Sequence, residues 1–238
     1  MPTPCPIENG ILAALSADEQ ASIFPHLHPV SLSVGQMLHE PDGIVDHVYF
    51  PTDAVIALLC TTEDGHSAEV AIIGYEGMAG VAAFSGGGQS SHHAVVQCPG
   101  SAFILSAKRL LAEFDKQGTF HRLALRYSQA LMTQMAQTAV CNRCHSIEQQ
   151  LCRWLLLSLD RTFSQALSMT QEQIAGMLGV RREGVAEAAG RLQRLGVIEY
   201  RRGHILVRSR AELERRSCEC YGAVKREVER LMSIDGTP

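Results

Sequence analysis

The 238-residue sequence has no apolar run of about 18 residues and no charged start followed by an apolar core. These absences argue against a membrane-spanning helix and against a secretory signal peptide, so we expect a cytoplasmic protein without a membrane partner. The eight cysteines then predict reduced thiols rather than disulfides. A net charge of −4 excludes a chain that binds nucleic acid through its overall charge.

Charge is nevertheless distributed unevenly along the chain. Residues 1–145 hold 6 Lys and Arg against 13 Asp and Glu, whereas residues 146–238 hold 15 against 12. Residues 181–210 alone carry 8 Arg against 3 Glu. A basic patch on one segment can bind phosphate even in an acidic chain, although a solvated charged surface would give the same counts.

Short apolar or alternating runs fill residues 30–110 and are separated by turn sequences such as Pro41-Asp42-Gly43. Strands at a spacing of roughly 8–12 residues predict an all-β sandwich or barrel. The runs that we expect to form strands are Val30–Val34, His47–Phe50, Ala54–Cys60, Glu69–Ile73, His93–Gln97 and Ala102–Leu105.

A helical period begins at Gln117. Apolar and small residues recur there at alternating steps of four and three over about three heptads, which favours a long helix that pairs with a second copy. A second stripe holds Leu125, Met132, Met135 and Ala139, so one stripe can face the chain's own domain and the other a partner. Burial of the whole helix within one monomer is the alternative. The first seam, which we assign to the dimer helix, contains Phe120, Ala124, Tyr127, Leu131, Gln134 and Thr138.

Residues 170–208 have the pattern of a winged helix-turn-helix. A capping box at Thr170 opens a first helix, Gly179 stands where a tight turn needs a left-handed residue, and a second helix begins near Arg181. Two alternating runs then predict a hairpin that forms the wing, namely Val197–Tyr200 and His204–Val207.

The side chains of this segment suit DNA. Arginine can bond guanine bidentately and glutamate can accept from cytosine, while the start of a helix can hold phosphate. A helical hairpin with a solvated arginine face is the plainer alternative. We predict contacts to double-stranded DNA from Thr170, Gln171, Arg181, Arg182, Glu183, Glu187, Arg201, Arg202 and His204.

With these motifs in place, the chain resembles the Crp–Fnr family of bacterial transcription regulators over nearly its whole length. The resemblance implies an α+β fold with a cyclic-nucleotide-binding-like β-roll sensor (1–116), a dimerisation helix (117–145) and a winged helix-turn-helix DNA-binding domain (146–238). It implies a transcription regulator rather than an enzyme. This regulator would bind a two-fold-symmetric operator as a homodimer, with RNA polymerase as a further candidate partner, and its domains would reorient about a hinge near Cys144–Ser146.

The resemblance is incomplete at the base-reading triplet. The family has an Arg, the next Glu, and an Arg four residues after that Glu. Arg182 and Glu183 match the first two positions, but Glu187 stands at the third. The operator therefore need not be the family's usual half-site.

The effector pocket departs further from the family. The family's nucleotide pocket uses a Gly-Glu pair followed by Arg-Ser/Thr-Ala, whereas no Lys or Arg lies between Gly77 and Ala107 here. Burying a cyclic phosphate without a cation is costly, so the sequence argues against cyclic AMP and leaves the effector unidentified. The candidate effector pocket comprises Gly74, Glu76, Gly77, His92, His93 and Ala94.

The cysteines suggest other cofactors, each of which we set aside. The segment 141–145, CNRCH, matches the c-type haem attachment pattern, but haem attachment requires export and we interpret the match as chance. The family's iron–sulfur branch uses an N-terminal cysteine cluster, whereas Cys5 stands alone. Cys218 and Cys220 could bind a metal or become oxidised; we expect ordinary packing and assign no metal ligand.

Two other functions remain open at this point. The chain could be a ligand-binding or scaffolding module that does not bind DNA sequence-specifically. It could also be an enzyme that uses Cys141 and His145 as a nucleophile and base, since they lie four residues apart. No orienting third group or oxyanion site accompanies that pair, which counts against the enzyme.

Overall fold

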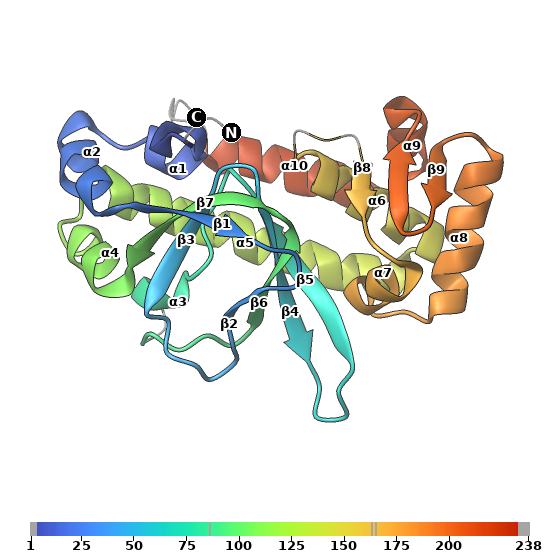
Figure 1. Cartoon of the computed structure of the whole chain (residues 1–238), viewed down its shortest axis with the longest axis horizontal. Helices are drawn as coiled ribbons and strands as arrows, with labels where there is room; N and C mark the ends of the chain where they lie inside the picture. The colour runs from blue at the N-terminus through green and yellow to red at the C-terminus, as the bar shows by residue number, and fades with distance from the viewer. Residues whose placement is uncertain (1–3, 86, 163, 165, 233–238) are drawn as a thin grey trace.

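The computed structural model describes residues 4–85, 87–162, 164 and 166–232. Two antiparallel sheets form the N-terminal half (Figure 1). One sheet has the order β1-β7-β3 and the other β2-β6-β4-β5. Their strands are β1 His28–Leu32, β2 Met37–His39, β3 His47–Pro51, β4 Val55–Thr61, β5 Ser67–Ile73, β6 His93–Cys98 and β7 Gly100–Ser106.

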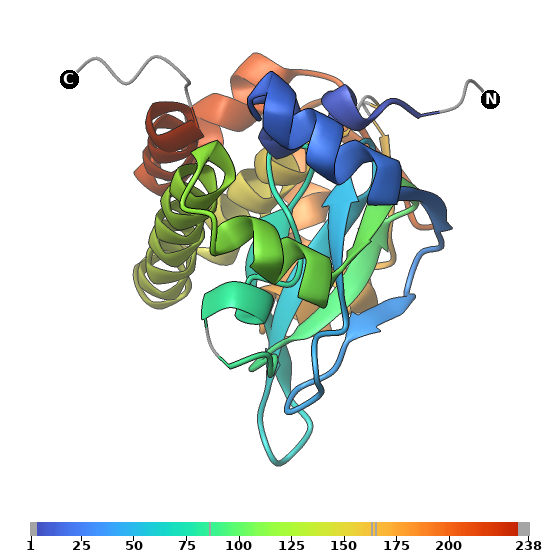
Figure 2. The ribbon, with the colours of Figure 1, turned by 90° about the vertical axis from the view of Figure 1, so that its left-hand side faces the viewer.

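Each sheet contributes one face to a buried core, and short helices cover the first sheet (Figure 2). Phe50 and Phe103 point from that sheet toward the helices, while Ile56 and Val96 of the second sheet lie in the core between the sheets. The helices are α1 Gly10–Ala13, α2 Ala17–Ile23, α3 Ala82–Ser85 and α4 Ala107–Phe114, with 3-10 turns at Pro6–Glu8 and Phe24–His26.

A long helix, α5 (Thr119–Cys144), runs along the sandwich and carries the chain into the C-terminal half. The last helix, α10 (Glu219–Met232), packs alongside it, as Figures 1 and 2 both show. The chain between them forms α6 Ile147–Leu159, β8 Ala166–Ser168, α7 Gln171–Leu178, α8 Arg182–Arg194, β9 Ile198–Arg201, β10 His204–Val207 and α9 Arg210–Arg216.

The C-terminal half docks directly on the second sheet through α6. Trp154 Nε1 donates to Glu69 Oε2 at 3.2 Å, and Gln97 Nε2 donates to Ser158 Oγ at 2.9 Å. Val55 and Ile72 of the sheet belong to the same apolar core as α6, α7 and α8. The two halves therefore share a core, and the position of α6 depends on the sheet.

The mixed fold predicted from the sequence is confirmed, and all six expected strands are present within a few residues of their expected ends. The short strand β2 and the helices α3 and α4 were missed. The strand β8 was also not predicted, and it pairs with β10 as a third strand of the wing sheet.

The proposed domain boundaries at 116 and 145 remain predictions, and residues 1–3 and 233–238 of the outer domains are not described. The structure adds that α10 leaves the third segment and packs along α5. None of the helices in the described ranges is long and apolar enough to cross a membrane.

Candidate DNA-binding surface and sensor cavity

The helix-turn-helix has the local geometry that its sequence predicts. Thr170 Oγ1 accepts from Gln173 N, and the Gln173 side chain accepts from Thr170 N, so the capping box is complete. Gly179 ends α7 with φ of 64°, a left-handed conformation that costs glycine little. Val185 of α8 is fully buried beneath the turn. These contacts fix the angle at which α8 leaves α7.

The start of α8 presents the predicted base-reading side chains to solvent. Arg181 caps the helix, and Arg182 and Glu183 occupy its first turn; all three are exposed. Among the described residues, none forms an ion pair with these three. Glu187 differs, because it accepts from Arg191 at 2.9 Å across one helical turn. The first turn of α8 is thus free to bind a partner, whereas Glu187 already has one.

The wing brings further predicted residues to the same surface. Arg202 and Gly203 form the tip of the β9–β10 hairpin, both with positive φ. A hollow of about 440 Å³ lies between the wing, the cap of α7 and the start of α8, and it is lined by Thr170, Gln171, Glu172, Arg182, Tyr200, Arg202 and Gly203.

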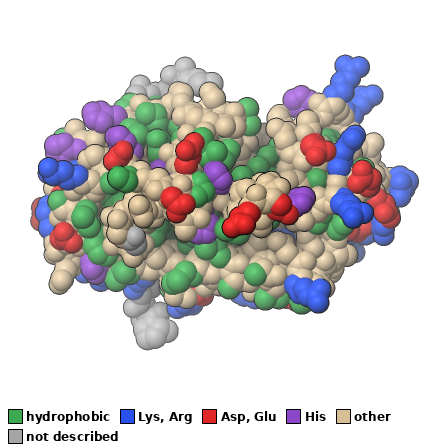
Figure 3. Space-filling model, turned by 90° about the horizontal axis from the view of Figure 1, so that it is seen from below, with side chains coloured by type: hydrophobic (Ala, Val, Ile, Leu, Met, Phe, Trp, Pro, Cys, Tyr) green, Lys and Arg blue, Asp and Glu red, His purple; other side chains and the backbone are tan. Residues whose placement is uncertain are grey.

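Arg201 and His204 flank this hollow without lining it, and the His204 ring lies 3.0 Å from Ser168 Oγ of β8. Tyr200 and Glu172 were not predicted; Tyr200 OH donates to Met169 O at 2.8 Å and so ties the wing to the start of α7. Figure 3 shows most of the Lys and Arg side chains on that face toward the end of the molecule that carries α8 and the wing.

A cavity of about 480 Å³ lies in the sensor half between the second sheet, α3 and α5. Apolar side chains such as Ile73 and Leu131, together with several serines, make up most of its lining. No Asp, Glu, Lys or Arg of the described chain lines it. Its polar groups include two histidines, His39 and His92.

Burial favours the uncharged form of both cavity histidines. Burial lowers the pKa of His39, which lies 2.8 Å from the backbone oxygen of His47 through Nε2. Burial likewise lowers the pKa of His92. The cavity therefore offers hydrogen bonds and apolar surface, but no cation for a phosphate.

The six predicted effector residues do not form one pocket. His92 lines the cavity, whereas Ala94 is buried between β2 and β4 and His93 sits at the start of β6. The glycines and Glu76 follow β5 and face the helices instead. A Cβ on Gly77 would approach the Tyr127 ring to 2.4 Å, and a Cβ on Gly74 would approach Arg161 to 2.6 Å.

Glu76 is held by the DNA-binding half. Arg161 Nε donates to Glu76 Oε1 at 2.5 Å, and both side chains are largely buried. Arg161 also donates to the backbone oxygen of Leu157 at 2.9 Å. The pair spans the two halves, so the structure gives Glu76 a role in domain contact rather than in the cavity.

The seam assigned to the dimer helix faces inward. All six of its residues are buried against the chain itself; for example, Gln134 Nε2 donates to the backbone oxygen of Ile72 at 3.2 Å. Of the two stripes predicted on this helix, the first therefore packs on the chain's own domain. In the second stripe Leu125 and Met132 are more than half exposed, Ala139 is exposed and Met135 is partly buried.

Comparisons with known proteins agree with this architecture. Residues 149–216 match the family model of the Crp-like helix-turn-helix domain. No curated protein matches the chain. The chain therefore carries a Crp-like helix-turn-helix domain and shares its fold with solved transcriptional regulators of the Crp/Fnr type. The predicted resemblance and fold class are confirmed.

Several solved structures share the fold at low sequence identity. FixK2 from Bradyrhizobium japonicum is 16% identical, with a TM-score of 0.65 over 81% of this chain and 98% of that one. TTHB099, a CRP-family transcriptional regulator from Thermus thermophilus, is 17% identical, with a TM-score of 0.65 over 79% and 96%. The c-di-GMP-responsive regulator CLP from Xanthomonas campestris is 14% identical, with a TM-score of 0.60 over 82% and 100%.

Proposed function

We propose that this Crp/Fnr-type regulator binds double-stranded DNA as a homodimer, with the start of α8 in the major groove and the wing on the phosphates. The observation that carries the proposal is the first turn of α8, where Arg181, Arg182 and Glu183 are exposed and form no ion pair with another described residue. Because the positive end of the α7 dipole and Arg202 lie beside them, the surface suits both base edges and phosphates.

The homodimer rests on the exposed stripe of α5. Leu125, Met132 and Ala139 are exposed and follow one another at steps of seven, the repeat of a two-stranded coiled coil. A second copy of α5 packed on this stripe would place two α8 helices on one DNA duplex. The operator would then have two-fold symmetry.

We propose an uncharged effector for the sensor cavity. The lining lacks a cation, and Met132 belongs both to the cavity and to the exposed stripe. A ligand in the cavity would therefore contact a side chain at the proposed dimer interface. Through this contact the ligand could bind two arrangements of the dimer with different affinity, which is how a ligand shifts a two-state equilibrium.

The remaining parts of the proposal follow from DNA binding. We assign the protein no catalytic role, place it in the cytoplasm with its cysteines reduced, and retain RNA polymerase as a candidate partner.

Selection from random-sequence DNA, followed by fluorescence anisotropy over a range of salt concentrations, tests the proposal. We expect a symmetric consensus for the wild type. Arg182→Ala should lose about 1–3 kcal/mol of DNA-binding free energy and relax the sequence preference at one base position. Arg202→Ala should weaken binding to all DNA sequences equally. It should also reduce the slope of log affinity against log salt concentration by about 1. Lys108→Ala, an exposed charge on α4 far from the wing, is the matched control and should change neither.

Two results would overturn the proposal. Selection that yields no consensus would favour a ligand-binding or scaffolding module. An equal loss of affinity in Arg182→Ala and Lys108→Ala would show that only overall charge matters.

A further inference from the structure

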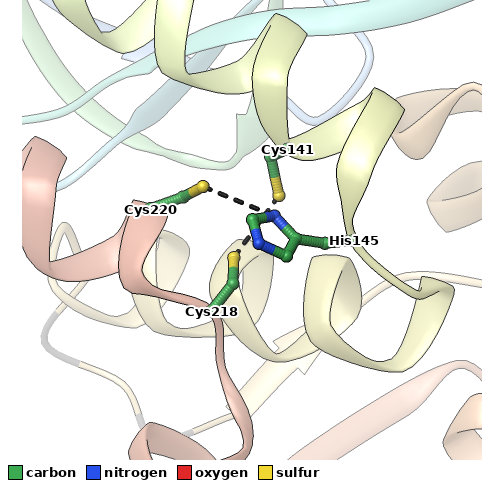
Figure 4. A group of neighbouring side chains, drawn as sticks. All are labelled: Cys141, His145, Cys218 and Cys220. Atoms are coloured by element: carbon green, nitrogen blue, oxygen red, sulfur yellow. Dashed lines mark hydrogen bonds between the residues drawn. The ribbon is translucent and has the colours of Figure 1, made fainter.

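Four side chains from two distant segments meet where α5 ends and α10 begins (Figure 4). Two lie at the C-terminal end of α5, one in its last turn and one at its C-cap, and two lie at the start of α10, one directly before the helix and one in its first turn. Their ligand atoms all lie within 4.8 Å of one another. This Cys₃His cluster consists of Cys141, His145, Cys218 and Cys220.

The spacing within the Cys₃His cluster is that of ligands sharing one ion. Tetrahedral Zn²⁺ binds sulfur at about 2.3 Å and histidine nitrogen at about 2.0–2.1 Å, so ligand edges of about 3.8 Å between sulfurs and about 3.6 Å between sulfur and nitrogen are expected. Cys141 Sγ lies 3.5 Å from Cys218 Sγ, and Cys220 Sγ lies 3.6 Å from His145 Nδ1. The S–S separation is also far longer than the about 2.05 Å of a disulfide.

The histidine is oriented as a metal ligand. Its Nδ1 points toward the sulfurs, while Nε2 lies 3.3 Å from a carboxylate oxygen of Glu219. A ligating imidazole commonly donates its other N–H to a carboxylate, which fixes the ring and raises its basicity. Gln137 Nε2 also donates to Cys220 Sγ at 3.1 Å, a contact that stabilises a thiolate.

Ordinary packing does not account for this arrangement. Cys141, Cys218 and Cys220 are 0%, 4% and 0% exposed, yet they form an apolar cluster of their own, separate from the larger cores. Buried cysteines that act as small apolar residues contact aliphatic neighbours. Here three sulfurs face one another around a histidine.

We propose that the Cys₃His cluster binds one Zn²⁺ ion in a closed, four-ligand structural site. Four protein ligands leave no open position for water or substrate, which separates the site from a catalytic zinc. Ligand atoms within 4.8 Å of one another are close enough to share a single ion, because small side-chain rotations bring them to the separation of about 3.8 Å expected for thiolates on one tetrahedral ion. Cys144 is exposed and lies outside the cluster, so the site does not use the haem-like CxxCH pattern.

The position of the ion gives it a structural task. Its ligands flank the winged helix-turn-helix, because α6 begins two residues after His145 and α9 ends two residues before Cys218. The ion would fasten both ends of this segment to the end of α5. The orientation of α8 relative to the dimer helix would then depend on the metal.

Metal analysis of the purified full-length protein under reducing conditions tests the proposal. We expect one zinc per chain in the wild type. Cys218→Ser and Cys220→Ser should lose most of the metal, whereas Cys144→Ser and Cys60→Ser, both exposed cysteines outside the cluster, should retain it. His145→Cys should also retain the zinc, since four cysteines form another common zinc site. His145→Ala should weaken zinc binding.

A second measurement uses only the wild-type protein, so it remains valid if a variant fails to fold. Wild-type protein stripped of metal with a chelator is titrated with Co²⁺, and tetrahedral thiolate ligation should give sulfur-to-cobalt charge-transfer bands and intense d–d bands that saturate at one equivalent. Wild-type protein that contains no zinc and gives no such bands would overturn the proposal. So would a disulfide between Cys141 and Cys218 found by mass spectrometry, or equal metal loss in Cys144→Ser. Neither measurement involves DNA, so their failure leaves the proposed function untouched.

Discussion

Arg161 and Glu76 are ion-paired across the boundary between the two halves of the molecule, with Nε and Oε1 2.5 Å apart. Arg161 follows α6, and Glu76 follows β5. Gly74 makes room for the pair, because a Cβ there would approach the Arg161 side chain to 2.6 Å. A residue that sequence analysis assigned to an effector pocket thus fixes the DNA-binding half on the sensor sheet.

Replacing one member of this pair should destabilise the protein strongly. The two side chains are 6% and 15% exposed, so Glu76→Gln leaves a buried guanidinium short of its counter-charge, at a cost of about 3 kcal/mol. Urea denaturation of the wild type and variant measures the loss.

Glu63→Gln is the control, because Glu63 is an exposed carboxylate between β4 and β5. It should change the free energy of unfolding by less than about 0.5 kcal/mol. In a double-mutant cycle, the variant that combines Glu76→Gln with Arg161→Met should lose less stability than the sum of the losses in the two single variants. Additive losses would mean that the two side chains do not interact.

The features predicted correctly depend on residues close together in the sequence. The capping box at Thr170 needs only two residues three positions apart, and it is present. The turn at Gly179 depends on one backbone conformation. The wing hairpin joins adjacent runs of the chain. Such local rules are available without tertiary information.

The errors concern contacts between distant segments. Two stripes on α5 were visible, but only the fold shows that Tyr127 and its neighbours face the chain's own sandwich. Glu76 lies 85 residues from Arg161, and no pattern in the sequence pairs them. Cys141 was considered with His145, and Cys218 with Cys220, but the two pairs were not considered together, because nothing in the sequence brings α10 back to the end of α5. Within each pair the spacing was compatible with metal binding. What the sequence did not show is that the two pairs lie next to each other in the fold.

The buried carboxyl of Glu69 should make stability depend on pH. Burial raises its pKa to about 8, partly offset by the hydrogen bond from Trp154. Since the folded-state pKa lies above the unfolded value of 4.5, the folded state binds the proton more tightly. The resulting stabilisation of the folded state is fully present below about pH 4.5. It is lost as the pH rises to about 8, and the loss in the free energy of unfolding is at most about 5 kcal/mol.

Glu69→Gln tests this dependence, because glutamine retains an acceptor for Trp154 but does not titrate. Urea denaturation at pH 6 and pH 8.5 should show a smaller loss of stability in the variant than in the wild type. Asp64→Asn, at an exposed carboxyl in the β4–β5 turn, should leave the wild-type dependence unchanged. Equal pH dependence in Glu69→Gln and the wild type would contradict the prediction.

A charge on the exposed stripe of α5 should dissociate the proposed dimer. Leu125 is 51% exposed and does not line the sensor cavity, so Leu125→Glu places like charges opposite each other in a dimer without altering the ligand site. We expect a shift toward monomer at micromolar concentration, measured by sedimentation, together with weaker binding to the symmetric operator.

Leu111→Glu provides the matched control, because Leu111 is a 40% exposed leucine on α4, away from the stripe. It should leave the dimer intact. A wild-type protein that sediments as a monomer, or a Leu125→Glu variant that remains dimeric, would contradict the assignment of the stripe.

The sensor cavity should not prefer a cyclic phosphate. No Lys or Arg of the described chain lines it, and burial lowers the pKa of both His39 and His92. A phosphate that entered would lose its hydration without gaining a counter-charge. Calorimetric titration with cyclic AMP and with adenosine isolates the contribution of the phosphate, because adenosine carries no charge. We expect cyclic AMP to bind no more tightly than adenosine. A preference for cyclic AMP of tenfold or more, about 1.4 kcal/mol, would show that a cation reaches the cavity, for example from the partner copy of α5.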